Sequence, residues 1–294
     1  MQLHGIIPPI VTPMKDDESL DLPRLRELID RLLLQGVHGI FVLGTTGEFY
    51  ALEETEKQAV IAEAVAHVNG HVPLLAGTGG ISTREVIRLT RMAEREGANA
   101  VSIITPYYIS PTQSEMIQHY QRIAESTAIP VVLYNNPSTC GGLRLEAESV
   151  ARLSELKNVV GIKDSSGDMQ HLLEILSLVP RSFAVLQGRD TLIFPALQAG
   201  AKGAVPSMAN LAARLCVEIY TAFQRGDWQA AEAAQKRFSP IRLGTALGTA
   251  PGAVKAGMAL LRDAFPVGPS RGPIAPLSAE KQQQLRAVLA AAGL

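Results

Sequence analysis

The chain has 294 residues, 47% of them apolar, and a formal net charge of −1. This length allows one large α/β barrel or two smaller domains, and the balanced charge provides no basic surface for nucleic acid. No apolar run approaches the ~18 residues that span a bilayer, and the first residues lack the basic and apolar regions of a signal peptide, so we expect a cytoplasmic protein that binds neither nucleic acid nor membranes.

Short apolar, β-rich runs recur along the first two thirds of the chain. They stand at 5–11, 39–43, 72–77, 100–104, 130–135, 159–163, 183–188 and 203–207. Between them, apolar residues repeat at the three- and four-residue spacing of helices. One such helix is predicted to begin after the cap Asp21 with an early Pro23, and another after the cap Ser82.

Eight strands alternating with helices, without a linker in mid-chain, predict a (β/α)8 TIM barrel. A doubly wound sheet is the alternative, but it would normally carry a glycine-rich phosphate turn after its first strand, where this chain has Thr12-Pro13-Met14-Lys15-Asp16. From about residue 211 only helical patterns remain, at 211–225, 227–238, 253–264 and 278–292. We therefore predict a catalytic barrel at 1–225 and a C-terminal helical extension at 226–294 that packs on it.

Lys163 occupies the end of the sixth predicted strand, where the next apolar residue would be expected. An unpaired buried ammonium is costly, so such a lysine tends to lower its pKa and become partly neutral. A neutral amine at a barrel mouth can form a Schiff base with a ketone. The structural alternative is that Lys163 pairs with a carboxylate or extends past the strand end into solvent.

The segment Gly44-Thr45-Thr46-Gly47-Glu48 follows the second predicted strand and precedes a helix. Its glycines let backbone N–H groups converge and its threonines add hydroxyl donors, which is typical of a small anion site. The segment is too short for a Walker A motif and lacks its lysine, so a carboxylate fits better than a triphosphate. A plain turn with a capping threonine is the alternative.

Tyrosines follow two other strands. Tyr134 ends the strand before that of Lys163, so its hydroxyl could move protons there; alternatively, it is a core aromatic with its hydroxyl in water. Tyr107 and Tyr108 lie on a loop, which is more typical of a protein interface.

The cysteines, Cys140 and Cys216, and the six histidines show no metal-ligand spacing, so we expect reduced thiols and no metal site.

Together these motifs resemble the dihydrodipicolinate synthase / N-acetylneuraminate lyase family of pyruvate-dependent class I aldolases. The resemblance extends over essentially the full length, including the helical extension. It is carried by Gly44-Thr45-Thr46-Gly47-Glu48, Thr105-Pro106-Tyr107-Tyr108, Tyr134-Asn135-x-Pro137 and Gly161-Ile162-Lys163.

The resemblance implies a set of roles at the pyruvate end of the site. Lys163 would form a Schiff base with pyruvate or a 2-keto acid, and Tyr134 would be the general acid and base. Thr45 and Thr46 would hold the keto-acid carboxylate, while the backbone carbonyl of Val205 would face the pyruvyl group. The lysine imine is itself the electron sink, so no metal or other cofactor is expected.

The resemblance also implies an assembly. Thr45 would pass protons between Tyr134 and Tyr108, and in the family that second tyrosine comes from across a subunit interface. Family members are typically pairs of dimers, so we expect a homotetramer here.

The second substrate is less constrained. In dihydrodipicolinate synthases an arginine usually follows the Asn-x-Pro-Ser stretch and binds the carboxylate of aspartate semialdehyde, whereas this chain has Thr139. A neutral hydroxyl cannot replace a guanidinium fork. Other positions resemble those that contact polyhydroxylated chains in the lyase and keto-deoxy-sugar-acid branches; they are Ser165, Gly188, Arg189, Asp190 and Ser207. Arg189 could still bind a carboxylate.

The first expectation is therefore a lyase that reversibly cleaves, or dehydrates through the same imine, a 2-keto-3-deoxy sugar acid or similar 4-hydroxy-2-keto acid. The alternative is 4-hydroxy-tetrahydrodipicolinate synthase, which joins pyruvate to aspartate semialdehyde. A remote alternative is a non-catalytic barrel that senses a keto acid.

Overall fold

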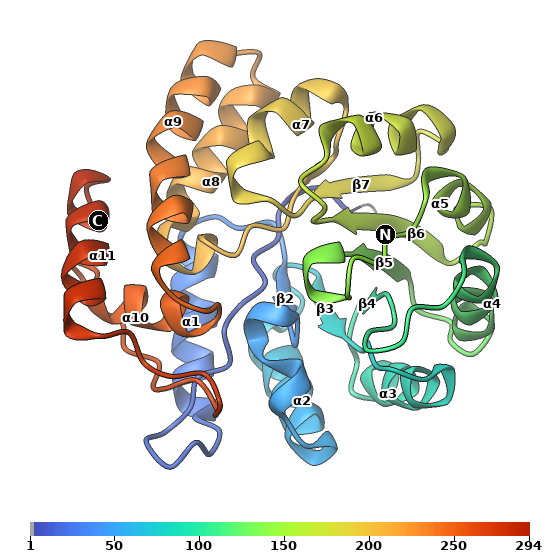
Figure 1. Ribbon diagram of the computed structural model, residues 1–294, viewed down its shortest axis with the longest axis horizontal. Helices are drawn as coiled ribbons and strands as arrows, with labels where there is room; N and C mark the ends of the chain where they lie inside the picture. The colour runs from blue at the N-terminus through green and yellow to red at the C-terminus, as the bar shows by residue number, and fades with distance from the viewer. Residues whose placement is uncertain (1–2) are drawn as a thin grey trace.

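The sheet of the computed structural model, which describes residues 3–294, contains eight parallel strands in the order β1-β8-β7-β6-β5-β4-β3-β2. The strands are β1 Gly5–Ile6, β2 Ile40–Val42, β3 Leu74–Gly77, β4 Ala100–Ile104, β5 Val131–Asn135, β6 Val159–Asp164, β7 Ala184–Gln187 and β8 Gly203–Ala204. Helices surround them in Figure 1. The predicted TIM barrel is confirmed.

The barrel closes between β1 and β2. The N–H of Phe41 donates to the carbonyl of Pro8 at 3.0 Å, and the N–H of Ile10 donates to the carbonyl of Phe41 at 2.9 Å. Pro8 and Pro9 have no N–H to offer a ladder, which explains why β1 ends at Ile6 although the apolar run continues to Val11.

Eight helices follow the strands. They are α1 Leu22–Leu34, α2 Glu54–Val68, α3 Thr83–Arg95, α4 Gln113–Ala124, α5 Ala147–Leu153, α6 Met169–Leu178, α7 Ile193–Ala199 and α8 Ala209–Gln224. Both predicted caps are confirmed, because the side chains of Asp21 and Ser82 accept hydrogen bonds from the first-turn N–H groups of α1 and α3. No helix within residues 3–294 combines the length and hydropathy needed to cross a bilayer.

Two apolar layers hold the barrel together. The larger lies between the strands and the surrounding helices. The smaller comes from the strands and the residues that flank them, and fills the barrel itself; its buried members are Leu3, Ile7, Phe41, Leu75, Ala100, Val132, Ala184, Leu186 and Val205. Because successive side chains of a strand point to opposite faces, the strands together with their flanking residues contribute to both layers.

The extension consists of α9 Trp228–Gly244, α10 Gly252–Leu260 and α11 Ala279–Ala291. Figure 1 shows α10 and α11 beside α9 and α1. Arg31 of α1 forms an ion pair with Asp263 at 2.8 Å, and the guanidinium of Arg24 lies 3.6 Å above the ring of Phe265. We propose that the barrel ends at residue 225 and the extension begins at residue 226, where Gly226 (φ +77°) turns the chain from α8 to α9.

Candidate active site

Lys163 stands near the carboxyl end of β6 and is buried, with 5% of its surface exposed. Its Nζ lies 4.0 Å from the centroid of the Tyr134 ring and 5.2 Å from that of Phe41. Phe41 belongs to the layer that fills the barrel, so the amine points into the barrel. Of the carboxylates between residues 3 and 294, none forms an ion pair with Nζ, and a structural ion pair therefore does not explain why this amine is buried.

Tyr134 lies opposite Lys163 in the register of β5 and β6. Its hydroxyl is 3.3 Å from the Thr45 hydroxyl and accepts a hydrogen bond from Nδ2 of Asn136 at 3.1 Å. Burial by itself raises the pKa of the Tyr134 phenol, but the positive charge of Lys163 and these hydrogen bonds outweigh it, so the net pKa lies below the ordinary value of 10.0. Asn136 contributes to this effect and was not predicted as a site residue.

Thr45 and Thr46 begin the short 3-10 turn η1, Thr45–Gly47, directly after β2. The N–H groups of Gly47 and Glu48 are used inside the turn, whereas those of Thr45 and Thr46 donate to no acceptor among residues 3–294. On the barrel side, the Thr12 hydroxyl donates to the carbonyl of Gly47 at 2.7 Å. Two N–H groups without an acceptor thus stand beside two hydroxyls, and we expect this turn to bind a small anion.

Asn135 and Asp164 tie together the ends of β5 and β6. Nδ2 of Asn135 donates to Asp164 at 2.7 Å, and Ser166 donates to the other carboxylate oxygen at 2.7 Å. The N–H of Ser165 also donates to the carbonyl of Asn135, at 2.8 Å. These bonds fix the height of Tyr134 relative to Lys163, and no sequence pattern pointed to them beyond the motif that contains Asn135.

The residues expected to contact the second substrate fall into two groups, and the first lies at the mouth of the barrel. Thr139 is exposed, with its hydroxyl donating to the carbonyl of Asn136 at 3.2 Å. Ser165 packs so closely on Gly188 that a side chain at position 188 would collide with it. Arg189 is half-buried beside Gly167, and its guanidinium forms no ion pair within the described chain.

The second group, Asp190 and Ser207, is already engaged in structural contacts. The buried carboxylate of Asp190 accepts hydrogen bonds from the Ser207 hydroxyl at 3.2 Å and from the N–H of Met208 at 2.8 Å. Burial raises the pKa of Asp190, against these hydrogen bonds and the charge of Arg242.

Val205 is buried in the barrel layer, and its carbonyl accepts no hydrogen bond from any described residue, so this oxygen is available to a ligand.

Tyr108 lies apart from these groups. Its side chain is 90% exposed and its backbone is left-handed, with φ +78°. Its neighbour Tyr107 is half-buried against the ring of Phe49, with the ring centroids 6.1 Å apart. A single chain therefore brings Lys163, Tyr134 and Thr45 together but does not bring Tyr108 to them.

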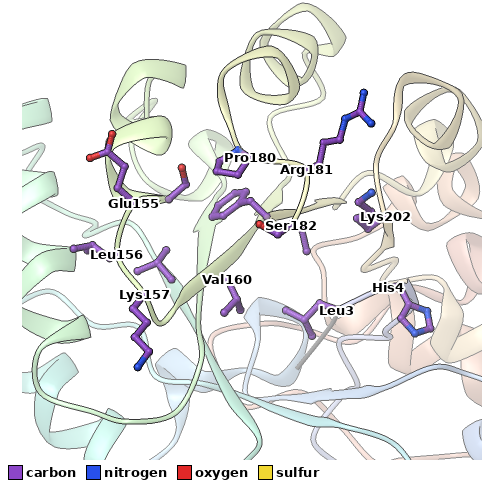
Figure 2. A pocket seen from close by; sticks show the side chains of 14 residues that line it. Leu3, His4, Glu155, Leu156, Lys157, Val160, Pro180, Arg181, Ser182 and Lys202 are labelled. Carbon is purple, nitrogen blue, oxygen red and sulfur yellow. The ribbon is translucent and has the colours of Figure 1, made fainter.

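A hollow of about 520 Å³ lies at the opposite end of the strands. Figure 2 shows Leu3 and Val160 in it, with the charged ends of Lys157 and Arg181 directed outward. It is lined by the starts of β6 and β7, whereas Lys163 stands near the end of β6. Near Tyr134 and Thr45 there is a small cavity of about 10 Å³. Because sites of TIM-barrel enzymes lie at the carboxyl ends of the strands, we expect the chemistry at the Lys163 end.

No group of three or more His, Cys, Asp or Glu side chains within residues 3–294 is arranged to hold a metal ion. The polar groups gathered here are instead an amine, a phenol, two hydroxyls and two free N–H groups. Such a set suits covalent capture of a keto acid, with its carboxylate on the Thr45–Thr46 turn and its carbonyl carbon near Nζ.

Comparisons with known proteins agree over nearly the whole chain. A model of the Dihydrodipicolinate synthetase family matches residues 2–292. The 4-hydroxy-tetrahydrodipicolinate synthase of Methanothrix thermoacetophila is 42% identical over 287 residues, which cover 97% of this chain and 96% of that protein. A dihydrodipicolinate synthase of Bacillus anthracis has a TM-score of 0.95 at 34% identity, covering 99% of this chain and 98% of that one. YagE, a prophage protein of Escherichia coli K12 solved in complex with pyruvate, has a TM-score of 0.95 at 33% identity, covering 99% of both chains.

Proposed function

Because the chain belongs to the dihydrodipicolinate synthetase family of pyruvate-dependent class I aldolases, which are lyases, we propose that it is a 4-hydroxy-tetrahydrodipicolinate synthase. In this reaction pyruvate condenses with aspartate semialdehyde. The observation that carries the proposal is the full-length similarity to proteins of that name, at 42% and 38% identity. It replaces the sugar-acid cleavage that the sequence favoured first.

The first half of the reaction takes place on Lys163. Its Nζ adds to C2 of pyruvate, and the carbinolamine loses water to leave a protonated imine. This imine draws electrons from C3, so C3 can lose a proton and become a nucleophilic enamine. Tyr134 moves the protons: it gives one to the departing hydroxyl and accepts one from C3. A lowered pKa brings the phenol closer to the working pH, where it can exchange between its protonated and deprotonated forms, which is why its contact with Lys163 matters.

The second half joins the aldehyde. The enamine carbon attacks the aldehyde carbon, and Tyr134 returns a proton to the aldehyde oxygen. The amino group of the semialdehyde then attacks the imine carbon, which closes the ring and releases Lys163. We assign the carboxylate of the semialdehyde to Arg189, because this half-buried guanidinium lies at the barrel mouth and pairs with no carboxylate of the described chain.

Trapping the imine tests whether the protein is an enzyme of this class. We expect pyruvate and borohydride to add the mass of one reduced pyruvyl group to the wild-type protein. Lys163→Ala should abolish the adduct. Lys157→Ala, which removes an exposed lysine at the other end of β6, should keep it. A wild-type protein without an adduct would favour the keto-acid sensor.

A substrate assay tests the choice of aldehyde. Losing a charge-assisted hydrogen bond should raise the KM for aspartate semialdehyde by about 10- to 100-fold in Arg189→Ala, with the KM for pyruvate unchanged. Arg144→Ala is the matched control, because Arg144 is also half-buried near the mouth but already pairs with Glu146 and Asp168. Equal effects of the two substitutions would remove Arg189 from the site.

Cleavage of a 2-keto-3-deoxy sugar acid remains the second candidate, and one observation favours it. Thr139 stands where dihydrodipicolinate synthases usually have an arginine, and its hydroxyl cannot bind a carboxylate as a guanidinium does. A panel of keto-deoxy acids, scored by pyruvate release, separates the candidates. Fast cleavage of one of them, with slow turnover of aspartate semialdehyde, would overturn the synthase assignment.

We also propose a homotetramer built from two dimers, in which a second copy covers the loop of Tyr108. Apolar side chains gather on that loop and nearby, since Tyr108 is 90%, Ile109 68% and Tyr50 47% exposed. Exposed aromatic groups of this kind are typical of interfaces. Sedimentation of Tyr108→Ala tests the assembly, and the expected result is a smaller species with reduced turnover.

We propose that the enzyme works in the cytoplasm without a metal or other cofactor. Cys140 and Cys216 are buried free thiols, which suits a reducing compartment. The lysine imine supplies the electron sink, so turnover should be unchanged after dialysis against EDTA. A loss of activity that Zn²⁺ or Mg²⁺ restores would contradict this.

A further inference from the structure

We propose that the C-terminal extension takes part in pyruvate binding, because it fixes the Thr45–Thr46 turn through a buried carboxylate, Glu48. Glu48, Lys255 and Arg271 are then positioning residues of the reaction. The inference rests on the proposed binding of the pyruvate carboxylate by this turn.

Glu48 is the residue that couples the turn to the extension. It lies directly after η1, with a left-handed backbone (φ +58°), and its side chain is fully buried. One carboxylate oxygen lies 2.7 Å from Nζ of Lys255 in α10. The other accepts a hydrogen bond from the N–H of Arg271 at 2.9 Å. Both partners belong to the extension, although Glu48 is only three residues after Thr45.

The pair between Glu48 and Lys255 allows little freedom. The Lys255 side chain is 2% exposed, and its Nζ also donates to the carbonyl of Pro269 at 2.6 Å. A charge in such surroundings is tolerated only when it is paired and hydrogen-bonded. If either group moved away, the other would be left as an unpaired buried charge. The carboxylate therefore has one position, and it holds the backbone at the end of the turn.

Arg271 forms hydrogen bonds with the segment that follows the turn. Its guanidinium donates to both carboxylate oxygens of Glu56 in the first turn of α2, at 2.7 and 2.8 Å. It also donates to the carbonyl of Ala51 at 2.8 Å, where the turn η2, Phe49–Ala51, ends. The Thr12 hydroxyl forms a hydrogen bond with Gly47 from the barrel side. The segment from Thr45 to Glu56 is therefore held by hydrogen bonds near both ends.

Stability alone is a weak explanation for this arrangement. The extension is already docked on α1 through Arg31, Asp263 and Phe265, none of which touches the turn. A buried ion pair is often no more stabilising than an apolar pair of the same volume. Its distinctive property is a fixed geometry, and the group whose geometry it fixes is the carboxylate-binding turn.

The test compares pyruvate binding with stability. The probe is pyruvate itself, and the readout is the pyruvate concentration that gives half-maximal borohydride trapping on Lys163, followed by intact mass. We expect this concentration to rise about tenfold in Lys255→Met and in Glu48→Gln. The first variant leaves the Glu48 carboxylate without its cation, and the second weakens the contact with Lys255 by removing the negative charge. The KM for the aldehyde should stay within about twofold, since the turn does not contact it.

Two further variants keep the test decisive. Arg271→Met alters a partly exposed side chain, so it provides a folded protein if Lys255→Met does not fold; it should raise the same concentration by about threefold to tenfold. Arg31→Met breaks a different ion pair between extension and barrel and should lower the melting temperature without changing pyruvate trapping.

Two outcomes would overturn the inference: unchanged half-saturation in folded Glu48→Gln and Arg271→Met, or an equal rise in Arg31→Met. Failure of the proposed function is distinguishable, because it would appear as a wild-type protein that traps no pyruvate at all.

Discussion

Replacing Tyr134 with phenylalanine removes one oxygen from the site and leaves the ring in place. The hydroxyl loses its contacts with Thr45 at 3.3 Å and Asn136 at 3.1 Å, while the ring can remain 4.0 Å from Nζ of Lys163. Positioned acid–base catalysis contributes about 10²–10⁴-fold, or about 3–5 kcal/mol of barrier. The loss of two neutral hydrogen bonds should lower stability by only about 1–2 kcal/mol.

The assay is steady-state turnover of pyruvate with aspartate semialdehyde, measured beside thermal unfolding and borohydride trapping. We expect kcat to fall at least 100-fold in Tyr134→Phe, because the positioned acid and base is lost. Trapping should still reach completion, only more slowly, because Lys163 is intact. This pattern separates a proton-transfer role from a binding role.

A matched control exists in the same barrel. Tyr120 is also fully buried, and its hydroxyl donates to the carbonyl of Ile103 at 3.1 Å. Tyr120→Phe removes a comparable hydrogen bond away from Lys163, so it should cost stability but not turnover. A Tyr134→Phe enzyme that keeps more than a third of wild-type kcat, or a Tyr120→Phe enzyme that loses as much kcat as Tyr134→Phe, would contradict a proton-transfer role for Tyr134.

Three further predictions concern other parts of the chain. Burial, and secondarily Arg122, lowers the pKa of His119 to about 4. Below about pH 6.5 this histidine is protonated in the unfolded chain but still neutral in the folded one. Up to about 3 kcal/mol of the free energy of unfolding should therefore be lost as the pH falls from 6.5 to 4. In urea unfolding, His119→Asn should not show this loss. Gly77→Ala should lower stability by about 1–3 kcal/mol in thermal unfolding, because a Cβ would collide with the carbonyl of Leu43. Thr139→Arg should leave the KM for aspartate semialdehyde within about twofold in a coupled assay, because its carboxylate is assigned to Arg189, and a tenfold fall in this KM would move the carboxylate to position 139.

The sequence predicted the strand ends well because their order is a local property. Eight apolar runs separated by helical periodicity fix a parallel barrel, and neighbouring runs then have neighbouring ends. Lys163 and Tyr134 therefore had to lie close together once their strands were recognised, and the register of β5 and β6 places them opposite each other. The length of β1 was less accessible, since it depends on how Pro8 and Pro9 meet β2.

The polar groups around the strand ends were harder to interpret. Asp190 and Arg189 are adjacent in the sequence and both suit a substrate contact. The structure shows that Asp190 accepts hydrogen bonds from Ser207 and Met208, while Arg189 pairs with no described carboxylate. A sequence shows which side chains can form hydrogen bonds, but not which of them already do so.

Local patterns along the chain were enough to predict the barrel and to put the amine next to the phenol, because strand patterns and strand order depend on neighbouring residues. Which charges hold the site in shape became evident only from the folded chain. Glu48 is fixed by Lys255 and by the backbone of Arg271, 223 residues further along the chain. Pairs so far apart leave no periodic pattern in a sequence, since what joins them is a distance of 2.7–2.9 Å through space.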